Sequence, residues 1–105
     1  MSPEKGKLAD PLQVATNVYT LNMENEYVRI MDARFSPGAK AVMHYHPNHV
    51  VYVLTDERVK ITTPDGKSVN FDLKAGQAIW MQAGQHAAEN LGKAEAHNLV
   101  IELKK

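Results

Sequence analysis

The chain has 105 residues, carries 12 basic and 12 acidic side chains, and contains no cysteine. This length predicts one domain with a single core. A zero formal charge without any basic block gives no electrostatic support for a nucleic acid or an anionic membrane as a partner. Disulfides and thiolate metal sites are excluded, so His, Asp or Glu must hold any transition metal.

The first 13 residues are expected to form a polar lead-in ahead of a single domain over residues 14–105. Pro3, Gly6 and Pro11 predict that no helix forms in this lead-in. The segment has no apolar stretch of the kind found in secretory signals, and no run approaches the ~20 apolar residues of a membrane helix. Together with the absence of cysteine, these features predict a cytoplasmic protein.

The rest of the chain consists of short β-type segments separated by turn residues such as Pro64-Asp65-Gly66. Turn signals recur about every 8–12 residues, as in an antiparallel sandwich or barrel, and no stretch keeps a helical period. We therefore expect an all-β domain. The expected strands cover residues 17–21, 27–35, 39–46, 49–54, 58–63, 68–73, 78–81, 86–90 and 96–103.

Two of these strands predict which side chains are buried. Residues 49–54 are apolar on both faces, which is typical of a strand buried on two sides. In the last strand His97 alternates in phase with Leu99, Ile101 and Leu103, so we expect it at the edge of a buried face. No other histidine pairs with His97, and it is interpreted as an ordinary rim histidine.

Residues 44–49 hold three of the five histidines. Side chains alternate along a strand, so His44 and His46 point the same way and form a potential chelate. His49 follows a Pro-Asn turn, and His86 lies far along the chain at the start of another strand. An antiparallel barrel brings remote strands side by side, which allows His86 to face the other three.

Ordinary structural histidines are the simplest explanation of this set. Four buried imidazoles without partners would each cost about 1–3 kcal/mol, against the ~5–15 kcal/mol by which domains are stable. The nearest acids, Asp56 and Glu57, lie in the turn beyond the strand and do not serve as partners. A divalent metal about 2.0–2.2 Å from each imidazole nitrogen resolves the problem.

The sequence around the first histidine pair resembles the first motif of the cupin superfamily, a group of small β-barrels. That motif runs Gly, five residues, His-x-His, three or four residues, Glu, six residues and Gly. Here Gly38 is followed by five residues and then by His44-Tyr45-His46. The motif glutamate is missing and His49 takes its place. Asp56 stands at the last glycine, and this residue type tolerates positive φ.

The second cupin motif also has a counterpart. It runs Gly, five residues, Pro-x-Gly, two residues, His, three residues and Asn. Here the tripeptide Gln82-Ala83-Gly84 takes the Pro-x-Gly position, so the proline is replaced by glutamine. One residue rather than two precedes His86, and Asn90 closes the motif, where we expect it to fix a turn.

The resemblance implies a single cupin-type antiparallel β-barrel of the jelly-roll kind. It also implies one divalent transition metal per chain, which could be Fe, Mn, Ni, Cu or Zn. Because a histidine replaces the glutamate, the chain resembles the small subset of cupins with four-histidine sites. The expected ligands are His44, His46, His49 and His86. In the alternative, His49 is a rim residue beside a three-histidine site.

Two functions stay open at this point. The first is a metal-dependent enzyme, either of the oxygenase type or a Lewis-acid isomerase or lyase, acting on a small organic molecule. The second is a non-catalytic module that binds a small molecule or a metal, and the fold does not choose between them. We also expect a homodimer, with Tyr45 as a candidate contact residue. Of Trp80 and Met81, one should face the interior.

Overall fold

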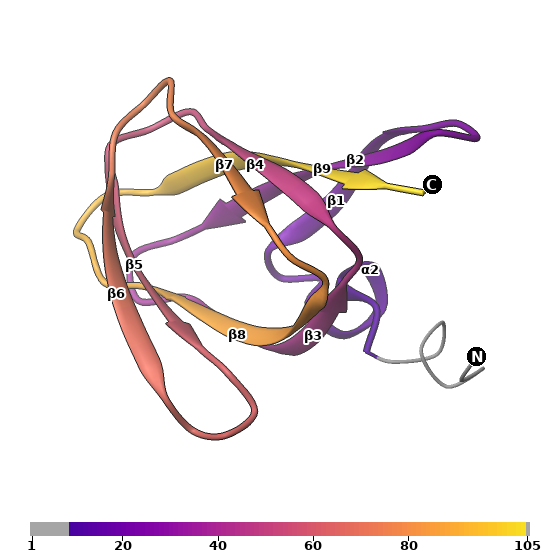
Figure 1. Cartoon of the computed structure of the whole chain (residues 1–105). Coiled ribbons are helices and arrows are strands. Elements are labelled where there is room, and N and C mark those ends of the chain that lie inside the picture. Colours follow the sequence, from indigo (N-terminus) through magenta and orange to yellow (C-terminus); the bar gives the residue numbers. More distant parts are fainter. Residues whose placement is uncertain (1–8, 105) are drawn as a thin grey trace.

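The computed structural model describes residues 9–104, which form nine strands and one short helix (Figure 1). Most of the predicted strands are confirmed, and three of them have the expected bounds. The elements are α2 (Pro11–Val14), β1 (Tyr19–Glu24), β2 (Val28–Phe35), β3 (Lys40–His46), β4 (His49–Val53), β5 (Glu57–Thr62), β6 (Ser68–Leu73), β7 (Ala78–Met81), β8 (Gly84–Asn90) and β9 (Ala96–Leu103).

The strands form two antiparallel sheets that face each other across the interior (Figure 1). One sheet has the order β1-β2-β9-β4-β7, and the other has the order β3-β8-β5-β6. The predicted all-β architecture of the jelly-roll kind is thus confirmed. The expectation of a closed barrel is wrong, because no strand of one sheet pairs with the other sheet within the described residues.

The short helix α2 lies where the sequence predicted none. Asp10 caps it by accepting a hydrogen bond from the amide of Leu12 at 2.9 Å, and Pro11 occupies the first turn, where its missing N–H costs nothing. The carbonyl of Ala9 accepts a bond from the amide of Tyr45 at 2.8 Å, which ties this segment to β3. Residues 1–8 of the expected lead-in lie outside the described part of the chain, and its boundary at residue 13 stays a prediction. Within residues 9–104, no helix is long and apolar enough to cross a membrane.

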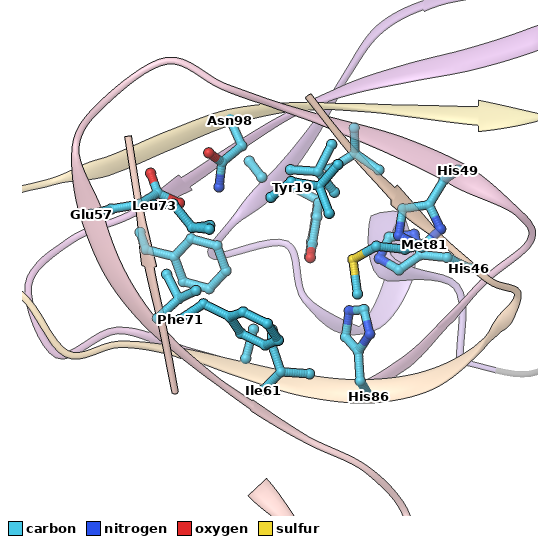
Figure 2. A pocket seen from close by; sticks show the side chains of 17 residues that line it. Tyr19, His46, His49, Glu57, Ile61, Phe71, Leu73, Met81, His86 and Asn98 are labelled. Atoms are coloured by element: carbon cyan, nitrogen blue, oxygen red, sulfur yellow. The ribbon is translucent and has the colours of Figure 1, made fainter. Parts of the chain in front are cut away.

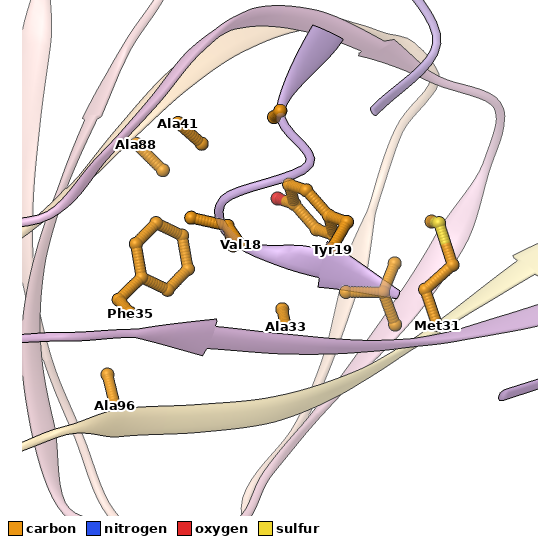
Figure 3. Close-up of a cluster of buried hydrophobic side chains, with 10 residues drawn as sticks. Val18, Tyr19, Met31, Ala33, Phe35, Ala41, Ala88 and Ala96 are labelled. Carbon is orange, nitrogen blue, oxygen red and sulfur yellow. The ribbon is translucent and has the colours of Figure 1, made fainter. Parts of the chain in front are cut away.

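A cluster of buried apolar side chains fills one part of the space between the sheets (Figure 3). Its aromatic members, Tyr19 and Phe35, meet edge to face with ring centroids 6.4 Å apart. Asn90 secures the adjoining turn: its amide nitrogen donates to the carbonyls of Phe35 and Ala94 at 3.0 and 2.9 Å, and its oxygen accepts from the Gly92 amide at 2.9 Å. The expectation that Asn90 fixes a turn is confirmed.

Two expectations about buried faces are wrong. Strand β4 lies between β9 and β7 in its sheet, but its outward-facing Tyr52 is 39% exposed, so the strand is not covered on both sides. In β9 the inward face is not the one with the larger apolar side chains. The buried residues of β9 are Ala96, Asn98, Val100 and Glu102. His97 and the apolar residues in phase with it therefore face outward, because small and polar side chains fit beside the histidines inside.

Candidate metal centre

Three histidines from two adjacent strands of the four-stranded sheet converge on a common point. The ligand atoms of His44, His46 and His86 all lie within 4.8 Å of one another. His44 and His86 are direct partners across β3 and β8, and their ring centroids are 4.8 Å apart. His46 lies two residues further along β3, on the same face as His44. This spacing allows three nitrogens to share one ion after small rotations of the rings.

An irregularity in β3 helps to aim these side chains. From Ala41 to His44 the strand advances three residues, while its partner β8 advances only two, from Ala88 to His86. Strict alternation would place Ala41 and His44 on opposite faces. The extra residue lets both point inward, and they are 1% and 0% exposed.

His49 approaches the same space from the opposite sheet. It begins β4, is 1% exposed, and its ring centroid lies 4.5 Å from that of His46. The distance to the His86 centroid is longer, at 6.3 Å, and His49 is not part of the group within 4.8 Å. The structure thus brings three predicted ligands close together and places the fourth, His49, nearer to His46 than to His86. Figure 2 shows His46, His49 and His86 at one side of the interior.

Three of the rings are fixed through the same nitrogen. The Nδ1 atoms of His44 and His49 lie 2.6 and 2.7 Å from the carbonyls of Val42 and Pro47. Carbonyl oxygens only accept hydrogen bonds, so both Nδ1 atoms must carry the proton. His46 Nδ1 lies 2.6 Å from the carboxylate of Glu102 and donates in the same way. All three rings therefore keep the lone pair on Nε2, the state that a metal ligand needs.

The partner of His46 belongs to a chain of charges that sequence reasoning missed. Glu102 on β9 is 3% exposed and accepts from the Arg29 guanidinium at 3.0 Å. Arg29 in turn makes two bonds of 3.0 Å to Asp10, the residue that caps α2. An acid inside the apolar run 99–103 was the available signal. The sequence does not reveal its role, because alternation predicts that the opposite face of this strand is buried.

Burial makes the histidines poor bases. Together with the neighbouring imidazoles, it lowers the pKa of His46 to about 2 and that of His86 to about 3. Burial also lowers the pKa of His44 and of His49. The pKa of Glu102 is raised by its own burial, with Arg29 opposing the rise. Near neutral pH the rings are therefore uncharged, so each keeps a lone pair that a cation can use.

A pocket extends from the histidines between the two sheets, with a volume of about 90 Å³ (Figure 2). His46, His49 and His86 line one end of it. Tyr19 also lines the pocket, and its hydroxyl lies 3.1 Å from Nε2 of His44. Burial raises the pKa of Tyr19, so the hydroxyl keeps its proton and donates it to this lone pair.

The remaining sequence predictions concern residues near the site. Met81 lines the pocket while Trp80 is 52% exposed, so the expectation that one of the two faces inward is confirmed. His97 lies apart from the cluster and bonds through Nε2 to Asp32 at 2.8 Å, which agrees with a histidine outside the site. No described residue other than glycine has positive φ, so Asp56 does not adopt the conformation that its motif position allows.

Comparison with known proteins gives this fold a family. No family model matches the chain. A cupin domain from Bordetella pertussis Tohama I superposes with a TM-score of 0.78 at 30% identity, covering 84% of this chain and 93% of that one. An RmlC-like cupin from Methanocaldococcus jannaschii has a TM-score of 0.63 at 16% identity, covering 81% and 79%. At that identity the second likeness shows the fold alone.

The chain belongs to the cupin superfamily. Among curated proteins it is similar to the β-alanine degradation protein BauB of Pseudomonas aeruginosa, with 37% identity over 85 residues. The matched region covers 80% of this chain and 86% of that protein.

Proposed function

We propose that this chain is a metal-binding cupin with a four-histidine site, and that it is a small metal-dependent enzyme acting on a small organic molecule. The observation that carries the proposal is the common state of the rings. His44, His46 and His49 are each fixed through Nδ1, which leaves Nε2 to bind a cation. Buried polar atoms normally have a partner, and packing alone does not supply one for these lone pairs.

The donor set also fits a transition metal. Neutral imidazoles suit Fe, Ni, Cu and Zn, and Mn remains a further candidate. His44, His46, His49 and His86 would hold the ion, with His49 reaching it from the opposite sheet. A bound divalent cation would supply Lewis acidity and open positions for oxygen atoms of a substrate or for O₂. Four neutral ligands leave its full charge in place, which favours such chemistry.

Two further residues would support this site. Glu102 holds the Nδ1 proton of His46 and so orients the ring, and Arg29 keeps the carboxylate in place. Tyr19 now donates its hydroxyl to Nε2 of His44. Once that nitrogen is a ligand, the hydroxyl needs another acceptor, and it is positioned to donate to an oxygen atom of a molecule in the pocket.

Metal analysis followed by turnover assays tests the proposal. The purified protein should retain about one divalent metal per chain after exposure to a mixture of the candidate ions and desalting. An oxygenase would consume O₂ with a small organic acid, diketone or thiol in an oxygen electrode. An isomerase or lyase would convert such a compound without O₂, as followed by NMR. A chain that retains no metal would contradict the proposal.

The alternative is a non-catalytic module that binds a small molecule or a metal. It is favoured by the scarcity of bases in the pocket, since its described titratable side chains other than the histidines are Tyr19 and Glu57. Such a module would show thermal stabilisation with metal and ligand but no conversion of any compound in the same assays.

We also propose that two copies pair through the outer face of the five-stranded sheet. Ile30, Ile101, Val50 and Trp80 are successive cross-strand neighbours there and form a continuous apolar row. A self-complementary face of this kind supports an isologous dimer. Trp80→Glu should convert a dimer to a monomer in sedimentation experiments. Lys60→Glu on the other sheet should not, and an unchanged dimer in Trp80→Glu would contradict the proposed interface.

A further inference from the structure

The end of the pocket opposite the histidines contains two polar side chains that the proposed metal site does not use. Glu57 at the start of β5 and Asn98 in β9 both line the pocket. Figure 2 shows them together on one side, with the three labelled histidines on the other. Leu73 lies beside Glu57, and Phe71 and Ile61 line the pocket between the two ends.

Each of these two side chains has one oxygen atom that could accept a hydrogen bond but receives none. Oε1 of Glu57 and Oδ1 of Asn98 are buried and make no hydrogen bond within the described residues. Asn98 is 7% exposed, so water does not reach its side chain freely. Buried acceptors in folded proteins nearly always have a partner, and the exceptions call for an explanation. Two such acceptors in one pocket indicate that a donor comes from outside the chain.

The Glu57 carboxyl group is held in place rather than loosely packed. Its second oxygen, Oε2, accepts from the Thr55 hydroxyl at 2.8 Å, and Thr55 in turn accepts from the His97 amide at 3.0 Å. Burial raises the pKa of Glu57, while side-chain hydrogen bonding to Asn98 and Thr55 opposes the rise. This anchoring fixes one oxygen and leaves the other directed into the pocket, as a recognition group requires.

The pocket between the two ends limits what can lie there. Its volume of about 90 Å³ restricts a ligand to a small molecule. Its middle is apolar, so the body of a bound molecule should be a short hydrocarbon chain. A molecule that spans the pocket would meet the histidine end with a metal-binding group and the far end with a hydrogen-bond donor.

We propose that Glu57 and Asn98 form a recognition subsite for the donor end of the ligand, a hydroxyl or ammonium group. The ligand class is then a small carboxylate with such a group at its opposite end. The assignment of the carboxylate to the histidine end rests on the proposed metal site. The recognition of a donor rests on the unpartnered Oδ1 of Asn98 and on Oε1 of Glu57, whose neighbour inside the chain is the Asn98 side chain.

Three probes of nearly equal shape test this inference: 4-hydroxybutyrate, 4-aminobutyrate and pentanoate. They differ only in whether a hydroxyl, an ammonium or a methyl group ends the chain. With zinc-loaded protein in calorimetry, at least one donor-ended probe should bind about tenfold or more tightly than pentanoate, the usual effect of a charge-assisted hydrogen bond. Equal affinity for all three would overturn the inference.

Substitutions assign the preference to the two residues. Asn98→Leu keeps the branched shape and removes the acceptor, and Glu57→Met does the same for the longer side chain. In each variant the preference over pentanoate should fall to about twofold or less. Glu95→Gln is the matched control, since Glu95 is exposed in an ion pair with Arg34 and should leave the preference intact. Persistence of the preference in both subsite variants would overturn the inference.

A second measurement separates this inference from the metal proposal. Metal content is determined on the same samples, and binding is repeated on metal-free protein by two-dimensional NMR. The side-chain amide signals of Asn98 should shift with 4-hydroxybutyrate but not with pentanoate, whether or not zinc is retained. If zinc binds but the Asn98 signals respond equally to both probes, the subsite is wrong and the metal site stands. If zinc does not bind but the selective shift is seen, the metal site is wrong and the subsite stands.

Discussion

The two ends of the pocket solve the problem of buried polar groups in different ways. At the histidine end, the Nδ1 atoms of His44, His46 and His49 have partners inside the chain. At the far end, Glu57 and Asn98 each keep an oxygen without a donor. The first end presents lone pairs to a cation, and the second presents oxygen acceptors to a hydrogen-bond donor. One pocket can therefore orient a molecule with unlike ends.

Among the variants considered, removing a central histidine should cause the largest change, a loss of metal affinity at the histidine end. His46→Ala deletes the ring that is close to all three other histidine rings. Metal affinity should therefore fall by more than the ~10–100-fold that follows loss of a residue hydrogen-bonded to a metal ligand. Metal content per chain after desalting, measured by mass spectrometry, tests this. His97→Ala is the control, and it should retain full metal content. Equal retention by both variants would mean that the rings do not share an ion.

Lowering the pH should weaken the metal-free fold through the same histidines. Their pKa values are depressed by burial, so below about pH 6.5 the unfolded chain binds more protons than the folded one. Each ring then removes up to about 1.4 kcal/mol of stability per pH unit. The raised pKa values of Glu57 and Glu102 act in the opposite direction at lower pH and reduce the net slope.

Urea unfolding of metal-free protein between pH 7.5 and 5 measures this slope. In His46→Ala the dependence of the unfolding free energy on pH should be shallower by about the contribution of one histidine. A stability that does not change across this range would show that the rings are solvated and not buried as described.

Disrupting the partner of His46 should have a smaller effect on the same end. Glu102→Gln keeps the shape but replaces the carboxylate that fixes the Nδ1 proton, so metal affinity should fall by about 10–100-fold. Competition with a chelator measures it. Asp32→Asn provides the matched control, because Asp32 bonds to His97 away from the pocket. A Glu102→Gln variant with unchanged affinity would exclude the proposed role of the carboxylate.

The contribution of the opposite sheet is expected to be smaller still. His49→Ala should reduce metal affinity by about tenfold, an effect no larger than that of an outer partner, because His49 lies outside the close group and the other three histidines would still hold the ion. The same chelator competition measures it. Unchanged metal content and affinity would mean that the site has three histidines, formed by His44, His46 and His86 alone.

At the far end, we expect the smallest effect of all, a slight gain in the stability of the ligand-free protein. Glu57→Gln brings an amide donor next to the acceptor of Asn98, and satisfying a buried acceptor contributes about 1 kcal/mol. The ligand-free variant should therefore resist urea slightly better than the unmodified chain. Glu95→Gln at the surface should be nearly neutral. A loss of stability in Glu57→Gln would indicate that the far end is already satisfied without a ligand.

Much of the histidine end could be predicted from the sequence. His44 and His46 share a face because strand alternation is local, and the spacing of the two motifs placed His86 near them. The irregularity between Ala41 and His44 could not be predicted, since it depends on how β3 pairs with β8. Neither could Glu102, because its role requires β9 to lie beside β2 and to turn this face inward. The cytoplasmic location and the dimer remain predictions.

The amino-acid sequence by itself determined the strands, the turns and the residue types that can hold a metal, because these follow from alternation, turn chemistry and the absence of cysteine. Only the tertiary structure decided which face of β9 lies inside and which acceptors meet in the pocket. In β9 the larger apolar side chains lie on the outward face, so local rules favour the wrong face. The choice depends on partners more than 40 residues away, such as His46 for Glu102 and the pocket neighbours Glu57 and Asn98.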